Sequence, residues 1–175
     1  IVNLSKMLRN FLQVSYRGNN LNAAGNESEI LLSTEIELLK AYIEFEQDKC
    51  HQHFRFWLEM DEKFHPDNYT LPPMLLQPFV ENAIRHGLLL QEKKGNLWLK
   101  FKTHKGDLIC IIEDDGVGME KSMELHKGQY QVHTSLGSKI VKERIQLLNQ
   151  MGYQITIQTS SRLPQGTTIE ITFKE

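Results

Sequence analysis

The chain has 175 residues, of which 40% are hydrophobic and 24% are charged, a composition that suits a soluble globular domain with a sizeable core. The formal net charge of −2 gives no electrostatic reason to expect direct binding to nucleic acid or to an anionic membrane. Two cysteines, Cys50 and Cys110, are too few for a disulfide framework or a cysteine zinc site, so we predict a reducing, cytoplasmic environment.

The N-terminal part of the chain predicts a helix followed by a linker. Apolar residues recur at helical spacing over residues 2–17, and the Gly/Asn-rich stretch 17–28 is typical of a loop. The chain begins at Ile1, without Met and inside the apolar pattern, which indicates a piece of a longer protein. We therefore expect a truncated helical segment with its linker over residues 1–30 and the main domain over residues 31–175.

The next segments predict a helix, a strand and a second helix. Thr34 and Glu37 have the spacing of a capping box, and the helical pattern that follows ends near Lys49. The stretch FRFWLEM, residues 54–60, alternates as a strand does. A turn then leads to a helix over about 73–87, in which Pro78 predicts a kink or a later start.

This helix over 73–87 carries two polar residues on the edge of its apolar stripe. At 100° per residue, Asn82 and His86 border the apolar side, whereas Glu81 and Arg85 point away from it. Such inward polar groups indicate either a ligand pocket or core-edge side chains hydrogen-bonded to loop backbone. The helical pattern alone leaves both readings open.

The second half of the chain predicts two pairs of strands with a helix between them. The expected elements are strands at 96–103 and 107–114, joined at Lys105-Gly106, a helix at 136–151, and strands at 153–159 and 167–174. The whole order predicts a two-layer α/β sandwich, with one mixed, mostly antiparallel sheet and helices on one face.

Two further stretches have the chemistry of a ligand site. The strand over 107–114 ends in DDGVG, where Asp114 precedes Gly116 and Gly118, so a carboxylate adjoins backbone that another group can approach closely. A plain glycine-rich turn has the same letters. Phosphate motifs of the P-loop and dinucleotide types are excluded, because Glu120 replaces the required glycine and no third glycine follows.

The other stretch is HTSLGSKIVKERIQLL, residues 133–148, where a polar loop meets the predicted helix. A helix start with Thr134, Ser135 and Gly137 beside it is suited to an anion. An ordinary helix start is the alternative reading of the same residues.

Together, LLQPFVENAIRHG, DDGVG and LGSKIVKERIQLL resemble, in order and spacing, the ATP-binding domain of LytS-type sensor histidine kinases. Upstream, LSKMLRNFL is similar to the end of that family's dimerisation helix region, and EIELLKAYIEFEQ is similar to its connecting helix. The resemblance implies the Bergerat fold of the GHKL superfamily, which agrees with the order of elements predicted above. It also implies ATP and Mg²⁺ as the bound cofactors.

The resemblance assigns the polar residues of the 73–87 helix to the phosphate end of the nucleotide. Asn82 matches the family residue that coordinates the Mg²⁺ bridging the ATP phosphates. Arg85 matches the basic position expected near the phosphates, and His86 follows it at the nucleotide side of the helix.

The same resemblance assigns the other two stretches. Asp114 matches the aspartate that accepts from the adenine amino group, and Gly116 and Gly118 match the glycines that permit close approach of purine and backbone. Residues 119–135 correspond to the mobile lid over ATP. Gly137 matches a glycine of the phosphate-facing loop, and the hydroxyls of Thr134 and Ser135 are expected to donate there.

Three departures from the family pattern qualify these expectations. The phosphate loop retains one glycine where the family has two or three, which predicts altered affinity and lid geometry. Pro78 occupies the position of the glutamate that serves as general base in gyrase and Hsp90-like ATPases, which favours phosphoryl transfer over hydrolysis. The family's acceptor histidine segment does not occur in this sequence, so no catalytic residue is assigned here, and we expect the fragment alone to be inactive.

The resemblance as a whole implies the catalytic domain of a two-component sensor histidine kinase. ATP would donate its γ-phosphoryl group to a histidine upstream of residue 1, from which a response regulator aspartate would receive it, often in a regulator of the LytTR type. The intact protein would be a membrane-anchored homodimer, joined through its N-terminal helical region, with this domain in the cytoplasm. The alternative is a non-catalytic nucleotide-binding or protein-interaction module, which the glycine-poor loop favours.

Overall fold

The computed structural model describes residues 29–51, 53–119, 121–122, 131–161 and 165–174, and the side chains of 131–139 are excluded. The predicted helix over 2–17, the linker over 17–28 and most of the predicted lid lie outside the described residues. The chain forms two compact units: Ile1–Gln52 with His65–Gln77, and His53–Phe64 with Pro78–Glu175.

In the first unit, a long helix follows a short strand pair. Strand β1, Ile30–Leu31, pairs antiparallel with β3, Thr70–Leu71, which follows the short 3₁₀ turn Pro66–Asn68. Helix α2 spans Leu32–Lys49, so the predicted end is confirmed, but the capping box at Thr34 and Glu37 is wrong. The helix begins three residues earlier than a cap at Thr34 would start it, because the backbone N–H of Leu32 donates to Tyr69 O at 2.9 Å, which replaces a side-chain cap.

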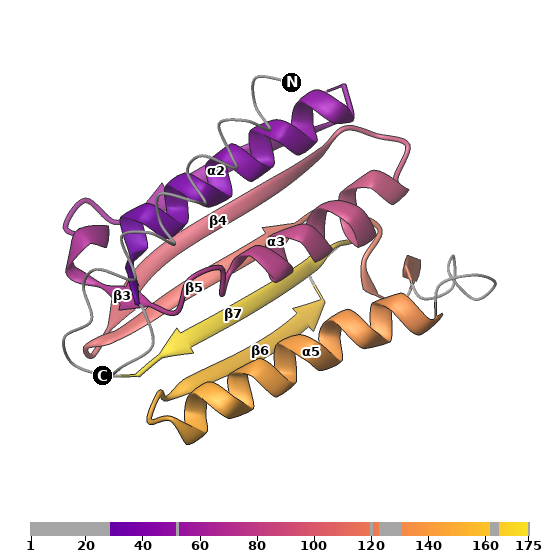
Figure 1. The fold of residues 1–175 in the computed structure, drawn as a ribbon. Coiled ribbons are helices and arrows are strands. Elements are labelled where there is room, and N and C mark those ends of the chain that lie inside the picture. The colour runs from indigo at the N-terminus through magenta and orange to yellow at the C-terminus, as the bar shows by residue number, and fades with distance from the viewer. Residues whose placement is uncertain (1–28, 52, 120, 123–130, 162–164, 175) are drawn as a thin grey trace. The chain divides into compact units, whose positions relative to one another are not determined.

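The second unit contains a five-stranded sheet in the order β2-β4-β5-β7-β6 (Figure 1). Strands β2 and β4 are parallel, and the other neighbouring pairs are antiparallel. The strands are β2 Phe54–Met60, β4 Gly95–His104, β5 Asp107–Asp114, β6 Ile155–Ser161 and β7 Thr167–Phe173. The predicted strands and hairpin are thus confirmed, and Lys105 and Gly106 have the positive φ values, 54° and 95°, that a tight hairpin turn requires.

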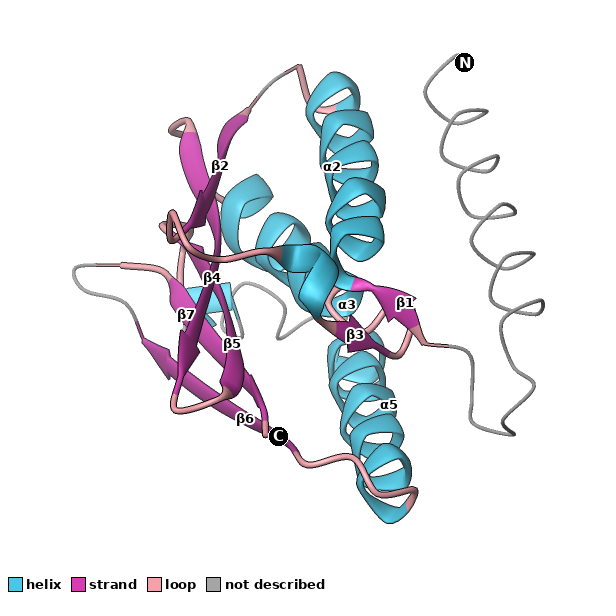
Figure 2. Cartoon of the chain, turned by 90° about the vertical axis from the view of Figure 1, so that its left-hand side faces the viewer, coloured by secondary structure: helices cyan, strands magenta, loops and turns pink. Residues whose placement is uncertain are grey.

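One face of this sheet forms the core of the second unit. Alternation directs the odd-numbered residues of β4 and the even-numbered residues of β5 to this face, and these side chains are buried: Leu97, Leu99, Phe101, Leu108, Cys110 and Ile112. Helix α3, Gln77–Asn82, and helix α5, Gln131–Gln150, both lie on one face of the sheet (Figure 2). The predicted α/β sandwich, with a mixed and mostly antiparallel sheet, is confirmed. None of the described helices is long and apolar enough to cross a bilayer.

The other face of the sheet carries a charged cluster formed by three strands. Lys100 Nζ lies 2.9 Å from Glu113 on β5 and 3.5 Å from Glu59 on β2. The hydrogen bond to Glu113 is the main reason that the pKa of Lys100 lies above its ordinary value of 10.5, although burial opposes the shift. The cluster therefore joins β2, β4 and β5 through one cation.

We expect Lys100→Gln to lower the free energy of unfolding by about 0.5–1 kcal/mol at neutral pH, because the cluster is partly solvated. The folded state raises this pKa, so the stabilisation is complete below pH 10.5 and is lost as the pH rises through the higher folded-state value. Urea unfolding of both proteins from pH 7 upward measures the difference. A difference that grows above pH 10.5 would contradict the assignment.

The segment after the first unit is short and irregular rather than one continuous helix. Helix α3 begins at Gln77, so Pro78 lies in its first turn, and the predicted later start is confirmed. The chain then widens into a π-helical turn, Ala83–Gly87, and tightens into a 3₁₀ turn, Leu88–Leu90. Such widened turns are frequent at functional sites.

Helix α5 begins earlier than the sequence pattern predicts. The expected start near residue 136 is wrong, since the helix already includes Gln131. The stretch 131–138 contains no proline and a single glycine, so its backbone can continue the helix. At the other end Gly152, at φ 106°, terminates the helix, and Asn149 bonds both backbone groups of Ile155 at the start of β6.

Candidate functional site

Asp114 is a buried carboxylate at the last position of β5. It shares the inward parity of Cys110 and Ile112, and only 3% of the residue is exposed. Its Oδ1 accepts the backbone N–H of Gly116 at 2.9 Å. The strand alternation therefore directs this charge to the helix-covered side of the sheet.

The glycine turn after Asp114 packs directly on the π-helical turn. A Cβ added to Gly87 would lie 2.6 Å from Asp114 Oδ1, and a Cβ added to Gly116 would lie 2.2 Å from the carbonyl carbon of Gly87. The backbone N–H of Val117 donates to Gly87 O at 3.2 Å. The structure thus brings the end of the FVENAIRHG stretch and the DDGVG stretch into backbone contact.

Gly116 and Gly118 are required for different structural reasons. Gly116 is required by the close approach of the Gly87 backbone, whereas Gly118 adopts φ 81°, which side chains disfavour. In the expectation from the sequence, both permitted close approach of purine and backbone. That expectation stays a prediction, and the contact that the structure shows at Gly116 is with the Gly87 backbone.

Gly166 and Thr167, which belong to none of the three predicted stretches, complete the surroundings of Asp114. Gly166 has φ 115°, and a Cβ there would lie 2.0 Å from Asp114 O. Thr167 is the register partner of Asp114 on β7, so its side chain shares the inward face. Only the pairing of β5 with β7 reveals these residues, although the glycine before the last strand was a visible turn signal.

The neighbouring Asp115 has a different role. Its carboxylate accepts both the backbone N–H of Asn96 at 2.6 Å and the side-chain amide of Asn96 at 2.7 Å. Asn96 in turn accepts from Trp57 Nε1 at 3.1 Å. This network ties the end of β5 to the start of β4, so Asp115 is committed to the sheet and Asp114 is the carboxylate directed toward the helices.

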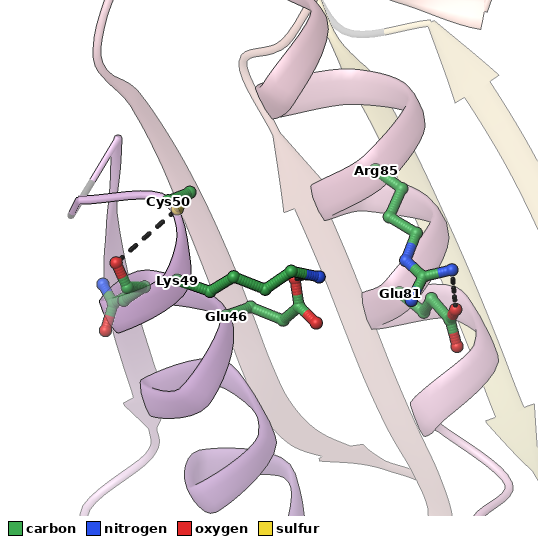
Figure 3. A network of polar contacts seen from close by, with 6 residues as sticks. Glu46, Lys49, Cys50, Glu81 and Arg85 are labelled. Atoms are coloured by element: carbon green, nitrogen blue, oxygen red, sulfur yellow. Dashed lines mark hydrogen bonds and ion pairs between the residues drawn. The ribbon is translucent and has the colours of Figure 1, made fainter. Parts of the chain in front are cut away.

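The polar residues of the α3 segment occupy unequal positions. Asn82 ends α3 and is half-buried, and His86 in the π-helical turn is half-buried with Nδ1 shielded from solvent. Arg85 is exposed, and its Nη1 lies 2.8 Å from Glu81 Oε1 along the helix surface (Figure 3). The predicted outward position is confirmed for Arg85, whereas Glu81 is half-buried, as Asn82 and His86 are, so burial does not separate the two predicted pairs.

The third predicted stretch is only partly described. Thr134, Ser135 and Gly137 lie within the backbone of α5, and their side chains are outside the described residues. Because α5 begins at Gln131, these residues lie in the first two turns of the helix rather than in a loop that precedes it. Their expected contacts with phosphate stay predictions.

The described residues contain no group of three or more His, Cys, Asp or Glu side chains that would hold a metal alone. Mg²⁺ does not require such a cage, since it usually retains waters and shares one or two protein oxygens with substrate phosphates. The half-buried amide of Asn82 can supply one such oxygen. The residues present therefore fit a metal that arrives with a phosphate ligand.

Comparison with known proteins agrees with this geometry. The profile of the family described as histidine kinase-, DNA gyrase B- and HSP90-like ATPases matches residues 71–175, which include every residue of the candidate site. The LytS sensor protein of Oceanobacillus iheyensis is 31% identical over 137 residues, covering 76% of this chain and 21% of the relative. The chain spans less than half the length of the curated relatives it matches.

Solved histidine kinases share the fold. The histidine kinase domain of the Erythrobacter litoralis blue-light activated kinase EL346 has a TM-score of 0.59 at 20% identity, covering 99% of this chain and 79% of that one. The kinase ThkA, solved in complex with the response regulator TrrA, has a TM-score of 0.56 at 16% identity, covering 97% and 46%. The sequence comparisons are consistent with this fold, and the chain belongs to the histidine kinase-, DNA gyrase B- and HSP90-like ATPase family, as an ATP-binding catalytic domain of the LytS sensor-histidine-kinase type.

Proposed function

We propose that this chain binds ATP with Mg²⁺ and supplies the γ-phosphoryl group to a histidine located upstream of residue 1. The observation that carries the proposal is the buried Asp114 carboxylate, held against the backbone of Gly87 at the end of the segment that contains Asn82. A purine acceptor and a metal ligand thus lie on two elements in contact.

The adenine end of the proposed site rests on the chemistry of Asp114. A carboxylate offers about four acceptor positions, so the bond from Gly116 does not by itself exhaust its capacity. An exocyclic amino group is a donor, and a buried carboxylate on the inward face is a matching acceptor. Thr167 is the partner of Asp114 across the ladder, and its hydroxyl would lie near the same base.

The phosphate end rests on Asn82, Arg85 and His86. Asn82 would hold Mg²⁺ through its amide oxygen, and the metal would neutralise charge on the phosphates. Arg85 lies one turn further along and would exchange Glu81 for a phosphate when nucleotide binds. His86 adds a half-buried imidazole on the inward side, and Thr134, Ser135, Gly137 and Gly118 would complete the contacts.

Phosphoryl transfer is favoured over hydrolysis by the start of α3. The position four residues before Asn82 is Pro78, in the first turn of the helix, and it has no group that can accept a proton from water. Phosphoryl transfer relies on positioning and charge neutralisation, so no strong base is needed on this domain. An accepting histidine elsewhere would receive the group instead.

The proposal extends to the whole protein through its relatives. LytS relatives are named sensor proteins, and ThkA was solved with a response regulator. We infer a homodimer joined through the N-terminal helical region, a membrane anchor upstream, a cytoplasmic site for this domain, and a response regulator, of the LytTR type, as the partner.

The test of phosphoryl transfer uses the full-length protein and ATP labelled in the γ-phosphate. We expect an acid-labile, base-stable label on the protein, and its transfer to the regulator when that protein is added. This chain alone should bind nucleotide without becoming labelled. Release of free phosphate by this chain, with no labelled full-length protein, would contradict the proposal in favour of a hydrolysing ATPase.

A separate prediction concerns the metal. In Asn82→Ala, the gain in nucleotide affinity on adding Mg²⁺ should fall by about tenfold, a loss of about 1.4 kcal/mol, because the proposed protein ligand is removed. Binding without Mg²⁺ should change little. Calorimetric titration with and without Mg²⁺ measures both quantities. Asn68→Ala, at an exposed asparagine, is the matched control, and an unchanged Mg²⁺ effect in Asn82→Ala would exclude the assigned role.

A further inference from the structure

Strand β6 forms one edge of the five-stranded sheet, since β7 is its only neighbour among the described strands (Figure 1). Its register with β7 runs without interruption from Ile155, opposite Phe173, to Ser161, opposite Thr167. The outer side of β6 is therefore a row of backbone N–H and C=O groups that β7 does not reach.

The hydrogen-bond pattern identifies the residues whose backbone groups face outward. The N–H of Lys174 donates to Gln154 O at 3.0 Å, so Gln154 and every second residue after it bond with the β7 side. The alternate residues Ile157, Thr159 and Ser161 therefore direct both of their backbone groups away from the sheet.

Ile155, at the start of the strand, faces outward in the same way, and a side-chain amide already pairs with it. Asn149 Nδ2 donates to Ile155 O at 2.9 Å, and Asn149 Oδ1 accepts the N–H of Ile155 at 2.8 Å. This amide occupies the position in which the backbone of an added strand would bond. Asn149 thus closes one end of the edge, and residues 157–161 form the part that it leaves open.

The composition of β6 suits pairing with a copy of itself. Natural edge strands commonly carry charges or proline, which prevent such pairing, and β2, the other edge strand, has Arg55 and Glu59 exposed. Strand β6 contains neither a charged residue nor a proline, and Thr159 and Ser161 are exposed. Two β6 strands can therefore approach each other without charge repulsion.

We propose that the open edge of β6 is a self-association surface, on which β6 of a second copy pairs antiparallel about a two-fold axis at Thr159. In this register Thr159 lies opposite its own copy, and Ile157 lies opposite Ser161 of the partner subunit, so every open residue is paired. Each pair exchanges two backbone hydrogen bonds, and the threonine pair adds a favourable side-chain contact. The inference goes beyond the proposed function and does not depend on it.

The first test is sedimentation of this chain over a range of concentrations up to about millimolar. The average mass of the wild type should rise with concentration. Thr159→Lys places two like charges opposite each other on the axis, so the concentration required for association should rise by at least about tenfold. Thr103→Lys, the same substitution at an exposed threonine of β4, should associate as the wild type does.

A mixture of two charge variants tests the register itself. Thr159→Glu alone should associate as weakly as Thr159→Lys, and an equimolar mixture of the two should regain association, because opposite charges then face each other. The recovery also excludes misfolding, since both variants must be folded to pair. A mixture that associates no more strongly than either variant alone would overturn the pairing at Thr159.

Hydrogen exchange separates this contact from association through other parts of the chain. In the wild type, the amides of Ile157, Thr159 and Ser161 should exchange at least about fivefold more slowly at high than at low concentration. Those of Gln158 and Ser160, which face β7, should change less. Exchange of the outward amides at the same rate at every concentration, or an average mass that does not rise, would overturn the proposal and indicate a strand from a different protein as the occupant.

Discussion

Asp114→Asn is expected to weaken ADP and ATP binding by roughly 30- to 1000-fold, about 2–4 kcal/mol, because a buried charged acceptor becomes a neutral amide. The amide can still accept from Gly116 through its oxygen, so the turn and the fold should persist. The amino group of the base would then meet a site that has lost its charge. Calorimetric titration, with circular dichroism as the check of folding, measures the effect.

The neighbouring aspartate provides the matched control. Asp115→Asn alters a carboxylate that bonds Asn96 twice, so it should lower stability without a comparable loss of nucleotide affinity. If the two substitutions weakened binding equally, or if Asp114→Asn bound as the wild type does, Asp114 would not be the purine acceptor.

Gly116→Ala is expected to lower the free energy of unfolding by about 3 kcal/mol, since overpacking against backbone is not relieved by a side-chain rotation. The new Cβ would lie 2.2 Å from the Gly87 carbonyl carbon and 2.5 Å from its oxygen. Separating these backbones would also stretch the Val117 N–H bond to Gly87 and move Asp114. Nucleotide affinity should therefore fall together with stability, which urea unfolding and titration measure.

The control for this substitution is Gly152→Ala, far along the chain from the site. No heavy atom lies within 4 Å of a Cβ at Gly152, and its φ of 106° leaves backbone strain as the only cost. That cost should be about 1–2 kcal/mol, with nucleotide affinity unchanged. A Gly116→Ala protein as stable as the wild type would show that Gly87 and Gly116 are not in close contact.

Local patterns predicted the sheet well. The alternation in FRFWLEM gave β2 with its observed bounds, and Lys105-Gly106 marked the hairpin turn correctly. These features depend on side-chain alternation and on the φ that a turn requires, both of which are visible in a short window. The parity that buries Cys110 and Ile112 also places Asp114 inward.

The two helix starts were predicted wrongly for different reasons. Thr34 does not cap α2, because Tyr69 satisfies the backbone N–H of Leu32. The start of α5 was misplaced because a polar stretch with one glycine has no period, although nothing in it prevents a helix.

Other site residues were missed because their partners are far along the chain. Gly166 and Thr167 adjoin Asp114 only through the β5–β7 pairing. No local window contains such pairs, so only the register of the sheet and the path of the chain reveal them.

The most direct test of the account is calorimetric titration of this chain with ADP and with a non-hydrolysable ATP analogue, with and without Mg²⁺. We predict saturable binding of one nucleotide per chain, stronger with Mg²⁺ for the ATP analogue. Absence of binding by the folded chain at about millimolar nucleotide, where an interaction of even 4 kcal/mol would register, would contradict an ATP site between Asp114 and the α3 segment.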